Sequence, residues 1–241
     1  GSYTDQFGNT DSDTDSEPDG YTGINPVSVD VEIVKKTNGL DNQNPTIVAG
    51  SAVTWTYEVT NQGTSGIAVA DLSVTDNIVG VTPAYSSGDG NTNNILDAGE
   101  TWIYTANGTA ILGQYNNTGT VNASATDAFG NTDSDTDSEP DSYVGVNVDV
   151  EIVKTTNGLD NANANLVIGS PVTWNYAVTN AGTVGIAVAD LSVTDNIAGV
   201  TPAYLSGDGN TNSILDVGET WIYQAAGTVV PGAYVNTGTA T

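Results

Sequence analysis

The feature that most constrains this chain is an internal repeat of domain length. Residues 29–122 align with residues 148–241 without a gap, and 70 of the 94 aligned positions are identical. The segment FGNTDSDTDSEPD also occurs twice, at residues 7–19 and 129–141. A period of about 120 residues is far longer than the unit of a solenoid and matches the size of one β-sandwich domain. The chain is therefore expected to contain two similar domains.

Short alternating apolar segments separated by turns predict an all-β fold. Val29, Val31 and Ile33 alternate with Asp30 and Glu32, which is the period of a half-buried strand. Further predicted strands lie at residues 53–59, 67–74, 102–106 and 115–125. Turn-rich segments such as TNGLDNQNP and SGDGNTNN separate them, and no segment has a helical period. The pattern predicts tandem immunoglobulin-like Greek-key β-sandwiches with no helices of note.

Composition argues against an enzyme. The chain has no His and no Cys, which removes zinc sites of the usual kind, Ser-His and Cys-His nucleophile pairs, and disulfides. Its 29 acidic residues and three lysines give a net charge of -26, so nucleic acid and anionic membrane surfaces are unfavourable partners. No apolar run is long enough for membrane insertion. Paired carboxylates can cleave glycosides, but these acids fall in predicted turns and linkers.

The phase of the repeat sets the expected domain boundaries. Gly1 is equivalent to Ala123, so the N-terminal segment corresponds to the end of a preceding repeat. The predicted units are residues 1–28, the last strand and acidic linker of that repeat; residues 29–147, repeat 1 with its linker; and residues 148–241, repeat 2 without its last strand. An open sheet edge invites pairing. Either the natural protein continues past residue 241, or residues 1–10 of the next copy fill the gap by donor-strand exchange.

The order of motifs resembles a known family of surface domains. The motifs are VEIVKKTNG, GSAVTWTYEVTNQGT, DLSVTDN, SGDGNTNNILDAGETWIY, GQYNNTGTV and TDSDTDSEPDSYVG. Both repeats resemble, along essentially their whole length, the conserved-repeat, immunoglobulin-like domain of very long bacterial and archaeal cell-surface proteins. The resemblance implies tandem extracellular modules at the cell surface that act as stalks, adhesins or filaments.

One loop in each repeat has the ligand spacing of a twelve-residue calcium loop, with oxygen ligands at positions 1, 3, 5, 9 and 12 and a backbone carbonyl at position 7. The candidate Ca²⁺ ligands are Asp89, Asn91, Asn93, Ile95, Asp97 and Glu100, and Asp208, Asn210, Asn212, Ile214, Asp216 and Glu219. Position 6 is Asn94 or Ser213 where such loops have Gly, and the expected flanks are strands. The alternative is a polar hairpin loop whose side chains bond its own backbone.

A second candidate metal site is the acidic linker, whose carboxylates alternate with small polar residues. The run contains Asp133, Asp135, Asp137, Glu139 and Asp141, and its first copy contains Asp11, Asp13, Asp15, Glu17 and Asp19. In an extended chain these carboxylates lie on one side about 6.6 Å apart. Divalent ions are predicted to bridge the linker to Asp30 and Glu32, or Asp149 and Glu151, with contributions from the turn residues Asn38, Asp41, Asn157 and Asp160. The alternative is a solvated, self-repelling spacer.

Lys35 and Lys154 fall on the inward phase of the first predicted strand, where an ammonium is unfavourable unless it is paired or consumed covalently. Asn117 and Asn236 fall on the inward phase of the late strand. Bacterial surface domains with Lys–Asn isopeptide bonds place these residues on the first and last strands, beside a protonated carboxyl. The candidate carboxyls are Asp71 and Asp190, or Asp76 and Asp195. The alternative is a lysine that bends out to water over its apolar stem.

Two classes of function remain. Trp55, Trp102, Trp174 and Trp221 fall in the apolar phase, which favours a core role over a sugar-stacking platform. One class is a calcium-stiffened structural module of a stalk or filament, whose partners are further copies in a covalent array or donor-strand polymer. The other is an adhesin module that binds a glycan or host surface. The loops TNGL and SGDGNTN are identical in both repeats, which favours the structural module.

Overall fold

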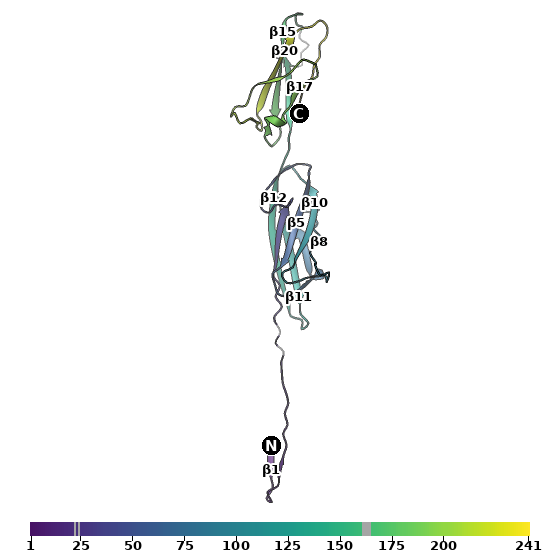
Figure 1. The fold of residues 1–241 in the computed structure, drawn as a ribbon, viewed down its shortest axis with the longest axis vertical. Helices are drawn as coiled ribbons and strands as arrows, with labels where there is room; N and C mark the ends of the chain where they lie inside the picture. The colour runs from purple at the N-terminus through teal and green to yellow at the C-terminus, as the bar shows by residue number, and fades with distance from the viewer. Residues whose placement is uncertain (22, 24, 161–164) are drawn as a thin grey trace.

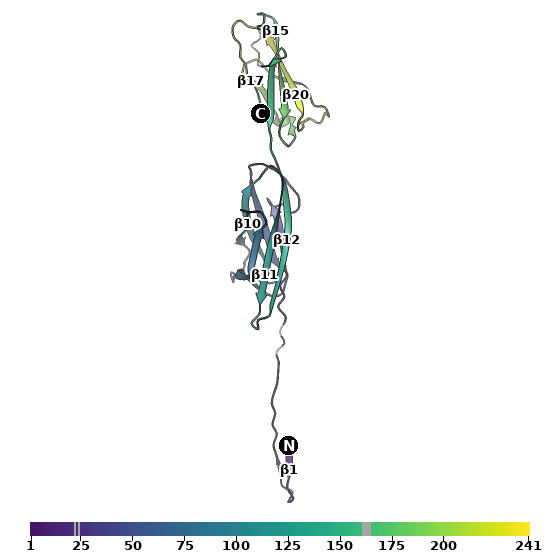
Figure 2. The same ribbon diagram turned by 180° about the vertical axis from the view of Figure 1, so that it is seen from behind.

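The computed structural model covers residues 1–241 and describes all of them except residues 22, 24 and 161–164. The described chain is all-β, which confirms the predicted fold class. Figure 1 shows an extended N-terminal segment followed by two β-sandwich units that lie end to end, and Figure 2 shows the same arrangement from behind.

The first sandwich is built from two four-stranded sheets. One sheet has the order β3 (Val31–Thr37), β5 (Ala52–Asn61), β10 (Thr101–Thr109) and β8 (Ala84–Ser87). The other has the order β4 (Thr46–Val48), β12 (Thr132–Val146), β11 (Gly113–Thr126) and β7 (Leu72–Asp76). A short pair, β6 (Ile67–Ala68) and β9 (Ile95–Leu96), and the 3₁₀ turn η1 (Val69–Asp71) complete it. Strand β12 pairs parallel with β4 and antiparallel with β11.

The second sandwich repeats part of this arrangement. Its larger sheet has the order β14 (Leu159–Asp160), β13 (Val150–Thr156), β15 (Pro171–Asn180), β20 (Thr220–Thr228) and β18 (Ala203–Ser206). Two short pairs join β16 (Ile186–Ala187) to β19 (Ile214–Leu215) and β17 (Val193–Asp195) to β21 (Gly238–Ala240), and η2 (Val188–Asp190) is a 3₁₀ turn. Within the described residues, no strand of this sandwich corresponds to β12.

The N-terminal segment forms a small hairpin and then an extended chain. Strand β1 (Ser2–Thr4) pairs antiparallel with β2 (Thr10–Ser12). Residues 11–20 are all exposed, and so is Tyr21. In Figure 1 this segment runs away from the first sandwich.

The core lies between the two sheets of each sandwich, where period-two alternation brings every second side chain inward. Val53, Trp55, Tyr57 and Val59 of β5 are all buried. All four tryptophans are buried, as predicted, and Trp102 is only 2% exposed. Burial of such large aromatic side chains supplies most of the apolar area that a small sandwich removes from water.

Two predictions of local structure are wrong. The acidic run expected to be a linker is strand β12, which extends through the whole first sandwich. The segment 67–74, expected to be one strand, is broken by η1 into β6 and β7. The only helices in the described part of the chain are the three-residue turns η1 and η2, so the described residues contain no helix that could span a membrane.

Candidate functional site

The acidic residues of β12 bond the backbone of the edge strand β3 and the residues that precede it. One carboxylate oxygen each of Asp133, Asp135 and Asp137 accepts a hydrogen bond of 2.9 Å from the backbone N–H of Val29, Val31 and Ile33, respectively. Glu139 accepts from the N–H of Lys35 at 2.7 Å, and Asp141 accepts from the hydroxyl of Thr37 at 2.6 Å. We call these five acidic residues of β12 the carboxylate ladder.

The regular ladder forms because the backbone N–H groups of β3 and the side chains of β12 repeat with the same period of two residues. Each bonded pair is separated by 104 residues, so β12 and β3 run parallel and in constant register. In an edge strand, every second backbone N–H points outward from the edge of its sheet. In β12, every second side chain points toward that edge. Charge-assisted hydrogen bonds of this kind satisfy the exposed edge of β3. They also explain how five carboxylates lie in one row along β12, where Lys35 is the basic side chain near the last two, Glu139 and Asp141.

In the described part of the second sandwich, the edge of β13 is equivalent to that of β3 but has no carboxylate ladder beside it. The amides of Val148, Val150, Ile152 and Lys154 are equivalent to those that the ladder bonds in the first sandwich. Within the described residues, no carboxylate accepts a hydrogen bond from them. Val31 and Ile33 are 3% and 2% exposed, whereas their equivalents Val150 and Ile152 are only half-buried.

A pocket in the second sandwich lies where β12 places an aromatic side chain in the first. In the first sandwich Tyr143 of β12 is fully buried, stacks on Tyr115 with ring centroids 4.7 Å apart, and accepts a hydrogen bond from the N–H of Ile111. Around the equivalent position the second sandwich has a pocket of about 530 Å³. The described residues that line it include Thr156, Leu166, Val172, Trp174, Val230 and Tyr234.

The N-terminal segment carries the sequence of a strand like β12. Residues 7–19 are identical to residues 129–141, and Tyr21 is equivalent to Tyr143. Tyr21 is 97% exposed. The hairpin register also agrees, because Ser2 pairs with Ser12 as Ser124 pairs with Ser134.

The turn of the hairpin is the same in both places. Asp5 accepts hydrogen bonds from the backbone N–H of Phe7 and Asn9 and from the Asn9 side chain. Asp127 makes the same three bonds to Phe129 and Asn131. These bonds to the charged form lower the pKa of both aspartates. The hairpin tip therefore forms in the N-terminal segment without the rest of a sandwich.

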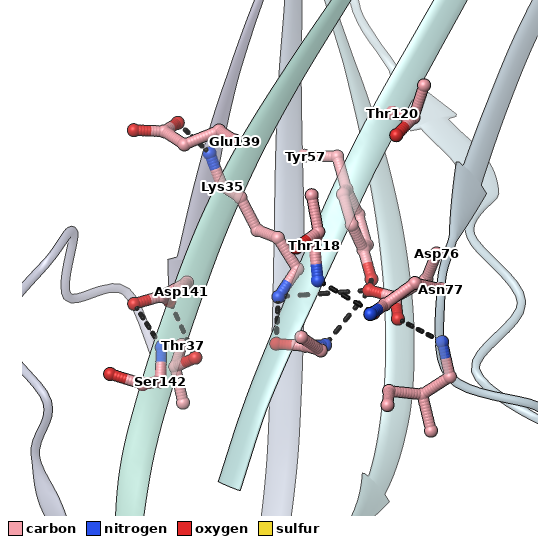
Figure 3. Close-up of polar contacts among 12 residues, drawn as sticks. Lys35, Thr37, Tyr57, Asp76, Asn77, Thr118, Thr120, Glu139, Asp141 and Ser142 are labelled. Carbon is pink, nitrogen blue, oxygen red and sulfur yellow. Dashed lines mark hydrogen bonds and ion pairs between the residues drawn. The ribbon is translucent and has the colours of Figure 1, made fainter.

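A second feature of the first sandwich is a buried cluster of Lys35, Asn117, Asp76 and Tyr57. Figure 3 labels Lys35, Asp76 and Tyr57 in this cluster. The Lys35 side chain, from β3, is fully buried and donates from Nζ to Oδ1 of Asn117 on β11. Asp76 Oδ2 accepts hydrogen bonds from Asn117 Nδ2 at 2.9 Å and from the Tyr57 hydroxyl at 2.7 Å. The same oxygen lies 3.8 Å from Lys35 Nζ. The predicted inward positions of Lys35 and Asn117 are therefore confirmed.

Burial in the cluster shifts Lys35 part of the way toward its uncharged form. Burial lowers the pKa of Lys35 to about 8, and the nearby carboxylates of Asp76, Asp141 and Glu139 oppose that shift only in part. Burial also raises the pKa of the Tyr57 hydroxyl, with further contributions from its hydrogen bond to Asp76 and from that charge. The free amine is therefore more accessible at neutral pH than in an exposed lysine.

The second sandwich has the same residues in a different arrangement. Lys154 Nζ donates to the backbone carbonyl of Asn236 at 3.0 Å and lies 3.2 Å from Asp195 Oδ2. Asn236 Nδ2 donates to Asp195 at 2.8 Å, and Tyr176 donates to the same oxygen at 2.6 Å. Burial alone would raise the pKa of Asp195, but the hydrogen bonds from Tyr176, Ile197 and Lys154 lower it. The Lys154 side chain is 15% exposed, against 0% for Lys35.

The structure selects one of the candidate carboxyls in each repeat and corrects one detail of the Lys–Asn prediction. Of the two candidate carboxyls in each repeat, Asp76 and Asp195 contact the cluster, whereas Asp71 and Asp190 are exposed in the 3₁₀ turns. Asn117 lies on β11, which β12 follows, so it is on the penultimate strand and not on the last one.

The predicted calcium loops bond largely to themselves. Asp89 accepts from the backbone N–H of Asn93 and Asn94, and Glu100 accepts from those of Gly90 and Asp97. Asp97 Oδ2 accepts from the side-chain amides of Asn91 and Asn93, and Asn93 accepts from the N–H of Ile95. The loop around Asp208, Asn210, Asn212, Ile214, Asp216 and Glu219 makes the equivalent bonds. The positive φ of Asn94 and Ser213, 59° and 63°, shows why position 6 of these loops needs a tolerant residue.

The residues expected to hold interdomain ions form no metal-binding group in the described part of the chain. Asp30, Glu32, Asp149 and Glu151 are exposed, and Glu32 bonds the side chain of Gln62. Asn38 and Asn157 instead accept from the backbone N–H groups of Thr54 on β5 and Thr173 on β15. Asp41 and Asp160 are exposed. Among the described residues, no group of three or more acidic side chains is arranged to hold a metal ion. Calcium binding remains a prediction.

Sequence reasoning missed the ladder and the pocket. A signal for the ladder was present, because five acidic residues at a spacing of two match five positions at the same spacing from Val29 to Thr37. The pocket had no such signal, since its shape depends on residues from four separate segments. Comparison with protein-family models and with curated proteins finds no match for this chain.

Proposed function

We propose that this protein is a structural repeat module of an extracellular stalk or filament, which assembles head to tail by strand donation. In this assembly, residues 1–24 of one copy complete the second sandwich of another. Residues 10–24 take the place of β12, and the hairpin at residues 2–12 is retained. The donated segment is longer than the residues 1–10 expected from sequence, because the residues equivalent to β12 lie beyond the hairpin turn.

The observation that carries the proposal is the match between Tyr21 and the pocket of the second sandwich. Tyr143 buries its whole side chain at the equivalent position of the first sandwich, and Tyr21 is 97% exposed. Removing an aromatic side chain of this size from water contributes about 2–3 kcal/mol. Asp11, Asp13, Asp15 and Glu17 would bond the edge of β13 as their equivalents bond that of β3.

The geometry of the sandwich suits a chain under tension. The chain enters the first sandwich at β3 and leaves it at β12, and these strands run parallel with the ladder between them. A force along the molecule therefore shears the ladder bonds together instead of opening them one at a time. The two sandwiches lie end to end (Figure 1), as a stalk requires.

Replacing Tyr21 by alanine tests this function. We expect Y21A to weaken assembly about a hundredfold or more, because deleting a buried aromatic side chain typically removes 3–5 kcal/mol. Y3A is the matched control, since Tyr3 is equivalent to Ala125 in the first repeat and should assemble like the unmodified chain. Sedimentation velocity and electron microscopy over a range of concentrations measure the outcome. The proposal would be contradicted if Y21A assembled at the same protein concentrations as Y3A. It would also be contradicted if the unmodified chain stayed monomeric.

Calcium binding by the two loops is a separate prediction of the same function. We expect Ca²⁺ to raise the thermal midpoint and a chelator to reverse the shift, since a ligand that binds only the folded state contributes about 2.7 kcal/mol at a hundred times its Kd. The double variant D97A/D216A should lose the response, whereas D71A, which removes an exposed acid outside the loops, should keep it. If the thermal midpoint of the unmodified chain did not change with Ca²⁺, these sites would be ruled out.

A further inference from the structure

We infer that Lys35 and Asn117 join in an intramolecular amide bond, and that Lys154 and Asn236 join only when an incoming strand completes the second sandwich. The second part rests on the proposed function, whereas the first part does not. The first sandwich would then carry a covalent link between β3 and β11, in a chain that has no cysteine.

The first part follows from the placement of three groups. Lys35 Nζ contacts the amide of Asn117 directly, with both side chains shielded from water. Asp76 Oδ2 contacts both the attacking and the leaving nitrogen, at 3.8 Å from Nζ and 2.9 Å from Nδ2. Tyr57 fixes that carboxylate through its hydroxyl. Gly119 allows the close packing, since a Cβ there would lie 2.8 Å from the Tyr57 ring. Nucleophile, amide and proton carrier are thus held together before reaction.

The reaction balances without a cofactor or an oxidant. The Lys35 ammonium passes one proton to the Asp76 carboxylate, and the resulting amine forms a bond from Nζ to Cγ of Asn117. The bond from Cγ to Nδ2 then breaks, and its electron pair stays on nitrogen. Nδ2 takes one proton from the attacking nitrogen and one from Asp76, and leaves as ammonium. Asp76 returns to its carboxylate form, so it acts as both base and acid.

The second part follows from what β12 does to β11. Asn117 lies within a strand of 14 residues and is paired with Asp141 of β12. Its equivalent Asn236 lies outside any strand, because β21 covers only Gly238–Ala240. Lys154 consequently contacts the backbone carbonyl of Asn236 and not its side-chain oxygen. An incoming strand that pairs with residues 232–241 would extend the strand through Asn236 and shield Lys154.

Intact mass measurement separates the two parts. The acceptor is the full Y21A chain, which keeps the second sandwich open, and the probe is a synthetic peptide with the sequence of residues 1–24. We expect Y21A alone to weigh one ammonia less than its sequence, and a second ammonia to be lost after the peptide binds. Proteolytic mapping should find the links at Lys35–Asn117 and Lys154–Asn236. D76N should lose the first link, and D71N, which changes an exposed carboxyl, should keep it.

Each contrary result has a distinct meaning. Full sequence mass in the unmodified chain overturns the first bond. Loss of two ammonias by Y21A without peptide, or peptide binding without a second loss, overturns the dependence on the incoming strand. If the peptide does not bind and the unmodified chain stays monomeric while one ammonia is lost, the proposed function fails and the Lys35–Asn117 bond stands.

Discussion

Replacing Gly23 by valine should abolish head-to-tail assembly while leaving the stability of the free chain unchanged. Gly23 is equivalent to Gly145 of β12. A Cβ on Gly145 would lie 1.7 Å from the carbonyl oxygen of Ile111, a contact that only backbone movement could relieve. In the free chain a Cβ on Gly23 meets nothing within 4 Å. The substitution therefore acts only when residues 10–24 occupy the position of β12. There, the clash with the backbone should weaken assembly about a hundredfold or more.

Two further variants make the Gly23 experiment specific. G20S is the matched control, because Ser142 is the residue at the equivalent position of β12, and it should assemble normally. G145V places the same clash inside the first sandwich and should lower its thermal midpoint. Sedimentation velocity measures assembly, and calorimetry measures stability. Normal assembly by G23V, together with a destabilised G145V, would show that residues 10–24 do not occupy the position of β12.

The alternation of apolar residues was enough to predict the strands and the core. It placed Lys35 on the inward face because it follows Val31 and Ile33 at the same phase, and the side chain is fully buried. The same alternation placed the four tryptophans in the core. These features depend on the local period of the backbone, which short segments of sequence contain.

Strand β12 could not be predicted from its own residues. Aspartate is depleted in strands, and a run of alternating acids ordinarily indicates a solvated spacer. Here the carboxylates are stabilised by backbone amides about a hundred residues away in the sequence, which no local propensity encodes. The pairing of Asp76 rather than Asp71 with Lys35 is also non-local. Asp71 ends the exposed turn η1, whereas Asp76 ends β7, which pairs with β11 beside Asn117.

The ladder also connects assembly with specificity. A donated strand with apolar side chains at these positions would leave the amides of the β13 edge unbonded, whereas carboxylates at a spacing of two bond each of them in a single register. A slip of one residue would turn every carboxylate away from the edge. The repulsion within the acidic segment keeps it extended and solvated in the free chain. In the proposed assembly, the same residues would therefore prevent collapse of the free segment and then set the register of the donated strand.

Replacing Asn117 by alanine should destabilise the first sandwich more than any other substitution of one polar side chain. The proposed bond spans 82 residues, and closing a loop of that length lowers the entropy of the unfolded chain by an amount worth about 4.5 kcal/mol, by the relation used for disulfides. N117A also leaves the buried Lys35 side chain as a free amine without its partner on Asn117. Denaturant unfolding followed by tryptophan fluorescence measures the change.

The migration of the unfolded chain in a denaturing gel distinguishes a covalent link from a loss of packing. A chain closed by an internal bond is more compact than an open one, so the unmodified protein should migrate faster than N117A in a denaturing gel. N122A is the matched control, because Asn122 lies on the same strand, is exposed, and its side chain accepts a hydrogen bond from the Thr136 hydroxyl, away from the cluster. It should keep the mass deficit, the fast migration and nearly all the stability. Equal migration of the unmodified chain and N117A would mean that the loss of stability comes from contacts alone and that no covalent link closes the loop.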